Sequence, residues 1–232
     1  MKLLKAAKAI LLFPLNARNA AVGVQALSER LEFVRRELFF EIKYGRPERR
    51  EDKPEIMRIV DQGKVDAAIR SGLRLNVGCG HVPLQGYVNV DMRAVPGVDV
   101  VAGLDDLPFE AGTVREISST HVLEHFPQEM LRRRLLPYWY GLLAPGGLFR
   151  AVVPDAKAMM SHYAAGTYGF EEFREVFFGA QDYEGDFHYN MFTPESISKL
   201  LAEAGFVDVA IPVEGRRNGK CFEFEVTGRR PG

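Results

Sequence analysis

The stretch LNVGCGHVPLQGYVNVD, residues 75–91, limits what this chain can fold into more than any other part. One apolar run leads into Gly78, Cys79 and Gly80, and a second apolar run ends at Asp91. Glycines at the end of a strand let the backbone approach a ligand closely, and an acid after the next strand can accept hydrogen bonds from a ribose. The stretch therefore predicts an α/β fold that binds a nucleotide-like cofactor.

The connection between these two runs is short. Residues 78–86 provide nine positions, fewer than the dozen or so that a helical crossover normally takes. A dinucleotide fingerprint also needs a third glycine and a helix N-terminus under the pyrophosphate, whereas His81, Val82 and Pro83 follow Gly80. We expect the first crossover helix to be shortened or absent, which argues against NAD.

The rest of the chain alternates short apolar runs with helical segments, which is typical of a parallel sheet with helices on its faces. We expect a doubly wound, mostly parallel, seven-stranded Rossmann-like sheet. The predicted strands are 73–77, 87–90, 98–101, 115–120, 148–153, 206–213 and 221–228. The short loop 214–220 predicts a closing hairpin, so one strand near an edge should be antiparallel. Pro137 should kink or split the helix predicted over 128–143, and Thr193 should cap a helix that begins at Pro194.

Residues 1–52 predict a basic helical extension. Residues 1–50 carry 11 Lys and Arg against 5 Glu, a net charge of +6, and the remainder has a net charge of −7. Residues 1–13 form a short basic amphipathic pattern, which predicts either peripheral contact with an anionic membrane or a plain docked helix. An apolar stripe over residues 24–42 predicts a helix that packs on the rest of the chain or forms a homodimer. Because the chain after residue 50 carries a net negative charge, nucleic acid is disfavoured as a partner.

Residues 45–54, charged and with two prolines, are predicted to be a linker. A helix is predicted over Glu55–Arg70, and either this segment or the basic extension should cover the sheet face that the missing crossover helix leaves open. The two cysteines lack metal-ligand spacing, and we predict no metal site. Because the chain has only two cysteines, we expect a cytoplasmic protein. A more specific hypothesis is that it attaches peripherally to the inner face of the membrane.

Six segments together resemble the motifs of a known enzyme family. In chain order they read LNVGCG, NVD, LDDLPFEAG, STHVLEHF, LLAPGGLFRAVVPD and HYNMFTPESISKLLAEAGF. They resemble class I S-adenosylmethionine-dependent methyltransferases, above all the predicted methyltransferases of the type 11-like group with a short first motif. The resemblance covers residues 73–229 and implies a methyltransferase domain over 53–232, with S-adenosylmethionine as cofactor and S-adenosylhomocysteine as product.

The resemblance also implies roles for single residues. Gly78, Cys79 and Gly80 would line the methionine part of the cofactor, Asp91 would hold the ribose, and Met92 would lie beside the adenine. Leu104 and Asp105 would meet the adenine edge, and Thr120 and His121 would lie near the methionine end. The family often has Asp where this chain has Gly103, so the adenine contact could move to Asp105 or to the backbone.

The acceptor is expected to be a small molecule or a glycan, methylated on a hydroxyl oxygen. His121 is the first candidate for the base that removes the hydroxyl proton, with a pocket-shaping role as the alternative. Asp155 could orient a base, bind the acceptor's hydroxyls or hold a divalent metal, although only scattered acids support a metal; His125 and His188 are further candidates for the base. Residues 155–192, rich in aromatics, suit a lid over the acceptor or ordinary helical packing. A different interpretation is a catalytically silent cofactor-binding protein that acts as an interaction module through its N-terminal helices.

Overall fold

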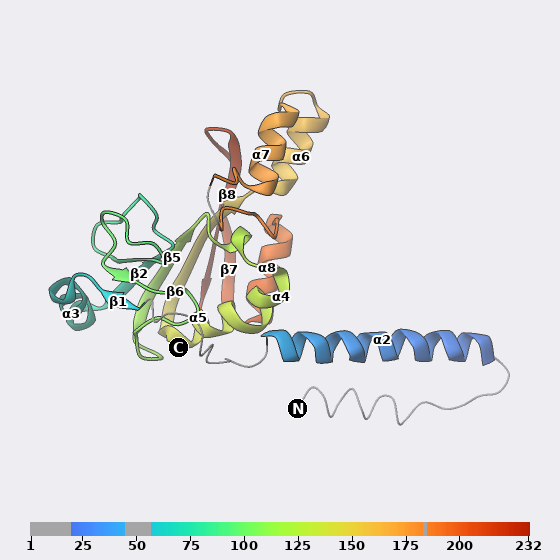
Figure 1. The fold of residues 1–232 in the computed structure, drawn as a ribbon, viewed down its shortest axis with the longest axis horizontal. Helices are drawn as coiled ribbons and strands as arrows, with labels where there is room; N and C mark the ends of the chain where they lie inside the picture. Colours follow the sequence, from blue (N-terminus) through green and yellow to red (C-terminus); the bar gives the residue numbers. More distant parts are fainter. Residues whose placement is uncertain (1–19, 45–56, 183–184) are drawn as a thin grey trace. The chain divides into compact units, whose positions relative to one another are not determined.

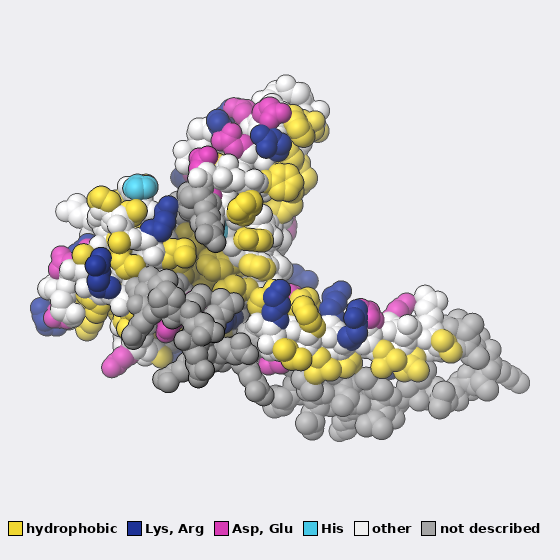
Figure 2. Space-filling view, in the orientation of Figure 1, with side chains coloured by type: hydrophobic (Ala, Val, Ile, Leu, Met, Phe, Trp, Pro, Cys, Tyr) yellow, Lys and Arg dark blue, Asp and Glu magenta, His cyan; other side chains and the backbone are white. Residues whose placement is uncertain are grey.

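A computed structural model describes residues 20–44, 57–182 and 185–232. The chain divides into two units, Met1–Arg49 and Arg50–Gly232. In the first unit the described residues form one helix, α2 (Ala20–Tyr44), which confirms the helix expected over 24–42 (Figure 1). Several of its apolar side chains, including Leu31 and Ile42, are exposed. Figure 2 shows hydrophobic side chains along this helix.

The functional assignments for the N-terminal part stay predictions. Homodimerisation through 24–42 is untested by the helix alone. Residues 1–13 and the linker 45–54 lie outside the described residues. Within the described ranges, no helix has the length and apolar character needed to cross a bilayer.

The second unit is built on one eight-stranded sheet in the order β1-β4-β3-β2-β5-β6-β8-β7 (Figure 1). The strands are β1 (Arg58–Ile59), β2 (Leu73–Val77), β3 (Val88–Asp91), β4 (Val100–Val101), β5 (Val114–Thr120), β6 (Leu143–Pro154), β7 (Val207–Asn218) and β8 (Cys221–Arg229). From β2 the chain adds β3 and β4 on one side and later β5 and β6 on the other, all parallel. β8 runs antiparallel between β6 and β7. The doubly wound Rossmann-like class is confirmed, with one strand more than expected because β1 pairs antiparallel with β4 at the edge.

The helices of the second unit have the following bounds. They are α3 (Gln62–Ser71), the 3₁₀ turn η2 (Leu123–His125), α4 (Gln128–Met130), the π-helical turn η3 (Leu131–Leu135), α5 (Leu136–Leu142), α6 (Ala156–Ala164), α7 (Phe170–Phe178) and α8 (Pro194–Glu203). No helix connects β2 to β3, as expected from the short connection. The π-helical turn lies just before Pro137, whose missing N–H removes a bond to the preceding turn, so the predicted break in this helix is confirmed.

α3 packs against β2 and β3 and buries Val65, so a helix does cover this part of the sheet. The predicted start of that helix was wrong. Residues 58–59 form β1, and α3 begins only at Gln62, where the carboxylate of Asp61 accepts a hydrogen bond from the backbone N–H of Lys64 at 2.9 Å. Local capping chemistry sets this boundary, because an Asp side chain can satisfy a free amide of the first turn.

The C-terminal elements agree with the sequence except in the length of the hairpin. Thr193 caps α8 in a capping box with Ser196. The predicted loop 214–220 was too long: β7 extends to Asn218, which pairs with Cys221, so that only Gly219 and Lys220 form the turn. Gly219 has a φ of +59°, the left-handed conformation that tight hairpin turns require.

The core lies between the sheet and the helices that follow β5 and precede β7. Trp139 of α5 is fully buried, with its ring centroid 6.0 Å from that of Phe149 on β6. Phe206, just before β7, lies 5.3 Å from Phe149. This apolar layer holds the central strands rigid, so that their carboxyl ends can position polar side chains.

Candidate functional site

The strand order reverses at β2, because the chain leaves β2 toward β3 and returns on its other side at β5. In open α/β sheets, ligands bind beyond the carboxyl ends of the strands at such a point. Here the turn after β2 touches the segment after β5: a Cβ added to Gly78 would lie less than 3.0 Å from Cγ2 of Val122. Gly78 also has a φ of +67°, so that both its conformation and its surroundings require glycine.

Asp91, at the end of β3, is bonded directly to this glycine turn. Its Oδ2 accepts a hydrogen bond from the backbone N–H of Gly80 at 2.8 Å. Its Oδ1 accepts one from the backbone N–H of Arg93 at 2.9 Å, and the Arg93 Nε lies 3.3 Å away. The residue is 5% exposed. An ionised carboxylate has about four acceptor positions, so this buried acid is held at the turn with capacity left for a ligand hydroxyl.

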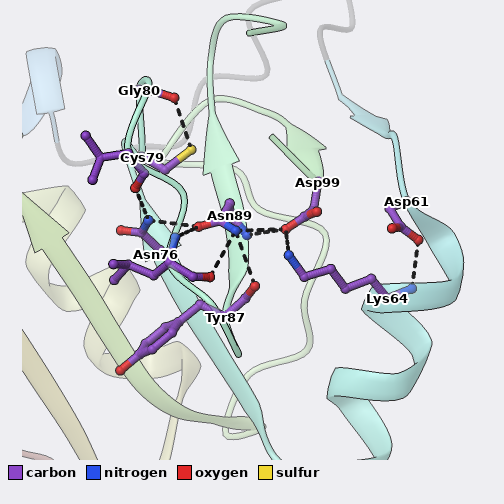
Figure 3. A network of polar contacts seen from close by, with 10 residues as sticks. Asp61, Lys64, Asn76, Cys79, Gly80, Tyr87, Asn89 and Asp99 are labelled. Carbon is purple, nitrogen blue, oxygen red and sulfur yellow. Dashed lines mark hydrogen bonds and ion pairs between the residues drawn. The ribbon is translucent and has the colours of Figure 1, made fainter. Parts of the chain in front are cut away.

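A buried network of side chains holds the loop from β2 to β3 where a helix would otherwise do so (Figure 3). The Asn76 amide donates to Asn89 Oδ1 at 2.9 Å, and the same oxygen accepts from the backbone N–H of Leu84 at 2.7 Å. Asp99 Oδ2 accepts from the backbone N–H of Asn89 at 2.7 Å and from Lys64 Nζ at 2.6 Å. These bonds satisfy polar groups that would otherwise be costly to bury, and they fix the turn without a crossover helix.

Cys79 lies inside the turn and is 6% exposed. Its backbone N–H donates to the carbonyl of Val90 at 3.0 Å. Burial raises the pKa of its thiol to about 11, and the negative charge of Asp91 adds to the effect. The thiol is therefore protonated at neutral pH and acts as a small packed side chain, not as a nucleophile.

The residues expected near the adenine separate into different environments. The backbone N–H of Ala102 donates to the Asp91 carbonyl at 3.1 Å, which brings the segment after β4 beside β3. Met92 is 62% exposed, at the surface next to Asp91. Leu104 packs against the main core, and its carbonyl accepts from the Trp139 indole. The Asp105 carboxylate lies 3.0 Å from Arg134, so it is committed to an ion pair.

His121 directly follows β5 and Thr120, and both of its ring nitrogens are engaged. Nδ1 lies 3.2 Å from Glu124 Oε1, and Nε2 lies 2.9 Å from Glu223 Oε2. Burial alone would lower the pKa of His121, but the bonds to the two buried acids outweigh it and raise the pKa to about 9. In this arrangement neither ring nitrogen is open to take a proton from an acceptor, so the structure favours a charged, positioning His121 over a base.

Glu223 is the site residue that sequence reasoning missed. It is 2% exposed, and Oε1 accepts from Arg216 Nε at 2.7 Å while Oε2 accepts from the Asn218 amide at 3.0 Å. These partners lie on β7, and Glu223 lies on β8 beside β6. The available signal was the run CFEFEV, in which two acids, Glu223 and Glu225, alternate with apolar residues; an acid that is buried on an inner strand requires a partner.

Asp155, a catalytic candidate from the sequence, has both carboxylate oxygens engaged by the protein. It is fully buried and caps α6. Its Oδ1 accepts from the backbone N–H of Ala158 at 3.0 Å, and its Oδ2 accepts from that of Gly215 at 3.2 Å. Because both oxygens bind backbone amides, this carboxylate joins β6, α6 and β7.

The segment between β6 and α8 contains α6 and α7 and returns to the end of β5. Tyr163 and Phe173 stack at 5.4 Å between α6 and α7, and Phe170 and Phe178 remain more than half exposed, giving an apolar surface (Figure 2). Farther on, His188 lies 4.7 Å from His125 between ring centroids, and burial lowers the pKa of His188. The use of residues 155–192 as an acceptor lid remains a prediction.

A cavity of about 780 Å³ lies at the other edge of the sheet. Its lining includes Gly72, just before β2, and residues near the starts of β5 and β6, such as Arg115 and Gly146. Ligands of parallel sheets bind at the carboxyl ends, so the polar groups around Gly78 and Asp91 are the better candidate site.

No protein-family model matches the sequence. No curated protein matches it either. Among solved structures, the chain is similar to a SAM-dependent methyltransferase from Archaeoglobus fulgidus, with 13% identity and a TM-score of 0.48, covering 72% of this chain and 90% of the other. It is similar to a SAM-dependent methyltransferase from Methanosarcina mazei, with 19% identity and a TM-score of 0.49, covering 68% and 92%.

A third similar structure is the 1,6-didemethyltoxoflavin-N1-methyltransferase of Burkholderia thailandensis, with 1,6-didemethyltoxoflavin and S-adenosylhomocysteine bound. The identity is 18% and the TM-score 0.48, covering 74% of this chain and 80% of the other. All three similarities are at low sequence identity.

Proposed function

We propose that this protein binds S-adenosylmethionine at the carboxyl ends of β2, β3 and β5 and transfers its methyl group to a hydroxyl of a small molecule or glycan. One observation carries the proposal: the Gly80 N–H donates to the buried Asp91 carboxylate, so the glycine turn and the acid form one unit. In this proposal Gly78 to Gly80 face the methionine part, Asp91 binds the ribose hydroxyls, and Met92 lies at the adenine.

The same geometry favours a cofactor without phosphate groups. A pyrophosphate is usually held by a helix N-terminus after the glycine turn, and between β2 and β3 there is none. Asn89 holds that loop instead, with its side-chain oxygen bound to the Leu84 N–H. S-adenosylmethionine offers a ribose to Asp91 and needs no helix dipole, so it suits these groups better than NAD.

Methyl transfer requires chiefly that the acceptor oxygen be aligned with the methyl group, since the cofactor supplies the reactive carbon. We propose that the acceptor is aligned by the surface that lies between His121 and the aromatic residues of α6 and α7. His121, held by Glu124 and Glu223, provides a fixed cation there. If the acceptor hydroxyl needs a base, His121 can serve only after one of these two acids releases the ring and the imidazolium loses a proton.

The binding step is tested by calorimetry with S-adenosylmethionine, S-adenosylhomocysteine and NAD. The wild type should bind the first two and not NAD. Asp91→Asn keeps the shape but removes the charge, and because a hydrogen bond to a charged group contributes roughly 1.5–3 kcal/mol, affinity should fall at least tenfold. Asp66→Asn, which alters a partly exposed acid on α3, is the matched control and should bind as the wild type does.

The transfer step is tested with methyl-labelled cofactor and a panel of glycans and small hydroxyl compounds. Label in an acceptor, with release of S-adenosylhomocysteine, supports the proposal. Tight binding without any transfer, or equal binding by Asp91→Asn and the wild type, would count against it. Binding without transfer is the behaviour expected of a silent interaction module.

A further inference from the structure

Three potential metal ligands meet beyond the end of β5. Glu124 and His125 belong to η2, and His188 belongs to the segment between α7 and α8. Each offers one ligand atom, and these atoms all lie within 4.8 Å of one another. The backbone N–H groups of Tyr189 and Asn190 donate to the Glu124 carbonyl at 2.8 and 3.1 Å, so the two segments are joined by the backbone. The cluster is thus a fixed feature of the fold.

Both imidazoles are already oriented for ligation. Nδ1 of His125 lies 3.1 Å from the Phe187 carbonyl, and Nδ1 of His188 lies 2.7 Å from the Val176 carbonyl. A carbonyl only accepts hydrogen bonds, so each Nδ1 carries the proton and each Nε2 keeps its lone pair. Metal-binding histidines typically have their second nitrogen fixed in this way.

The side chain of Glu124 gives a second, independent indication of a metal site. Its side chain is fully buried, and Oε1 is bound by His121. Oε2 is also buried but has no hydrogen-bond partner among the described residues. A buried carboxylate oxygen without a partner is costly, whereas a cation between Glu124 and the two imidazoles would satisfy it.

We propose that Glu124, His125 and His188 bind one divalent transition metal ion, with Zn²⁺ as the best-suited probe. Two imidazoles and one carboxylate suit zinc, and three protein ligands leave a fourth position for water or an acceptor oxygen. With metal–ligand bonds of about 2.1 Å, tetrahedral ligand atoms lie roughly 3.4 Å apart, so the cluster, whose ligand atoms lie within 4.8 Å of one another, needs to contract by at most about 1.4 Å. The ion would tie the α7–α8 segment to β5. This site goes beyond the proposed function, and its occupancy does not depend on S-adenosylmethionine.

The test uses full-length protein without a histidine tag, stripped with a chelator and titrated with ZnCl₂ by calorimetry. We expect one ion per chain and a higher melting temperature in its presence. His188→Ala and, separately, His125→Ala should each weaken binding at least tenfold and remove the thermal shift. His162→Ala is the matched control, because His162 stacks on Phe222 outside the cluster and should leave zinc binding unchanged.

A further variant and a spectroscopic measurement keep the test decisive if an alanine variant does not fold. His188→Gln retains bulk and polarity, and circular dichroism in chelator checks its fold. Co²⁺ added to the stripped wild type should give the visible absorption of a four-coordinate site, and this absorption should be absent in His188→Gln. Absence of zinc binding by the wild type, or equal binding by the wild type and a folded His188 variant, would overturn the proposal. Neither result depends on cofactor binding, so failure here leaves the proposed function separately testable.

Discussion

Gly78→Ala should destabilise the protein through one identifiable contact. At a φ of +67°, a non-glycine residue costs about 1–2 kcal/mol in backbone strain. The new Cβ would also lie less than 3.0 Å from Cγ2 and 3.3 Å from Cγ1 of Val122. Val122 is 6% exposed and packs in the main core, so it cannot move away freely, and such overpacking costs about 1–3 kcal/mol. We expect a loss of about 2–5 kcal/mol in the free energy of unfolding.

Two further variants separate these contributions. Gly112→Ala has a similar φ of +75° with no atom within 4 Å, so it should show only the backbone strain. Adding Val122→Ala to Gly78→Ala should recover the overpacking part, a coupling of about 1–3 kcal/mol in a double-mutant cycle.

Urea unfolding can be followed by the fluorescence of Trp139, the only tryptophan, which is fully buried. Each variant is also titrated with S-adenosylmethionine, whose binding should weaken in Gly78→Ala and remain in Gly112→Ala. If both glycine variants lose the same free energy, the close approach between the turn and Val122 is not what requires glycine at this position.

Two other expectations concern α8 and the thiols. Thr193→Ala removes the oxygen that accepts a hydrogen bond from the Ser196 N–H. It should lower the free energy of unfolding by about 1 kcal/mol in the same urea titration. Lys199→Ala, in the exposed middle of that helix, is the control, and an equal loss there would contradict the capping argument. Burial raises the thiol pKa of Cys79 to about 11 and that of Cys221 to about 12. Since the thiolate is the reactive form, iodoacetamide at pH 8 should modify them slowly in the native protein and rapidly in urea, as measured by mass spectrometry; rapid native labelling would refute this.

The main features of the sheet could be predicted because they depend on short-range patterns. Alternation of apolar residues and glycine turns located β2, β3 and β5, and the nine-residue connection ruled out a crossover helix. The cap at Thr193 followed from local chemistry in the same way. β1 escaped prediction because two residues have no periodicity, and they become a strand only by pairing with β4.

The candidate site was less predictable, since its residues owe their roles to partners far along the chain. His121 looks like a free base in the sequence, yet Glu223, 102 residues away, binds its second nitrogen. Asp155 looks catalytic at a strand end, yet Gly215 on β7 uses its second oxygen. The proximity of His188 to Glu124 could not be read from the sequence, because it depends on the docking of the segment after α7 against η2.

The sequence by itself determined the alternation of strands and helices from β2 onward, the glycine turn at Gly78 to Gly80, the acid at the end of β3 and the absence of a helix between β2 and β3. Hydrophobic periodicity, turn conformation and capping act over a few residues, so they can be recognised in the linear chain. Only the tertiary structure decided which side chains are charged, which are already bound to other groups of the protein, and which can still bind a ligand. Those properties depend on the register of β6 with β8 and on the docking of residues 187–190 against η2, and both are set by packing between segments that are distant in sequence.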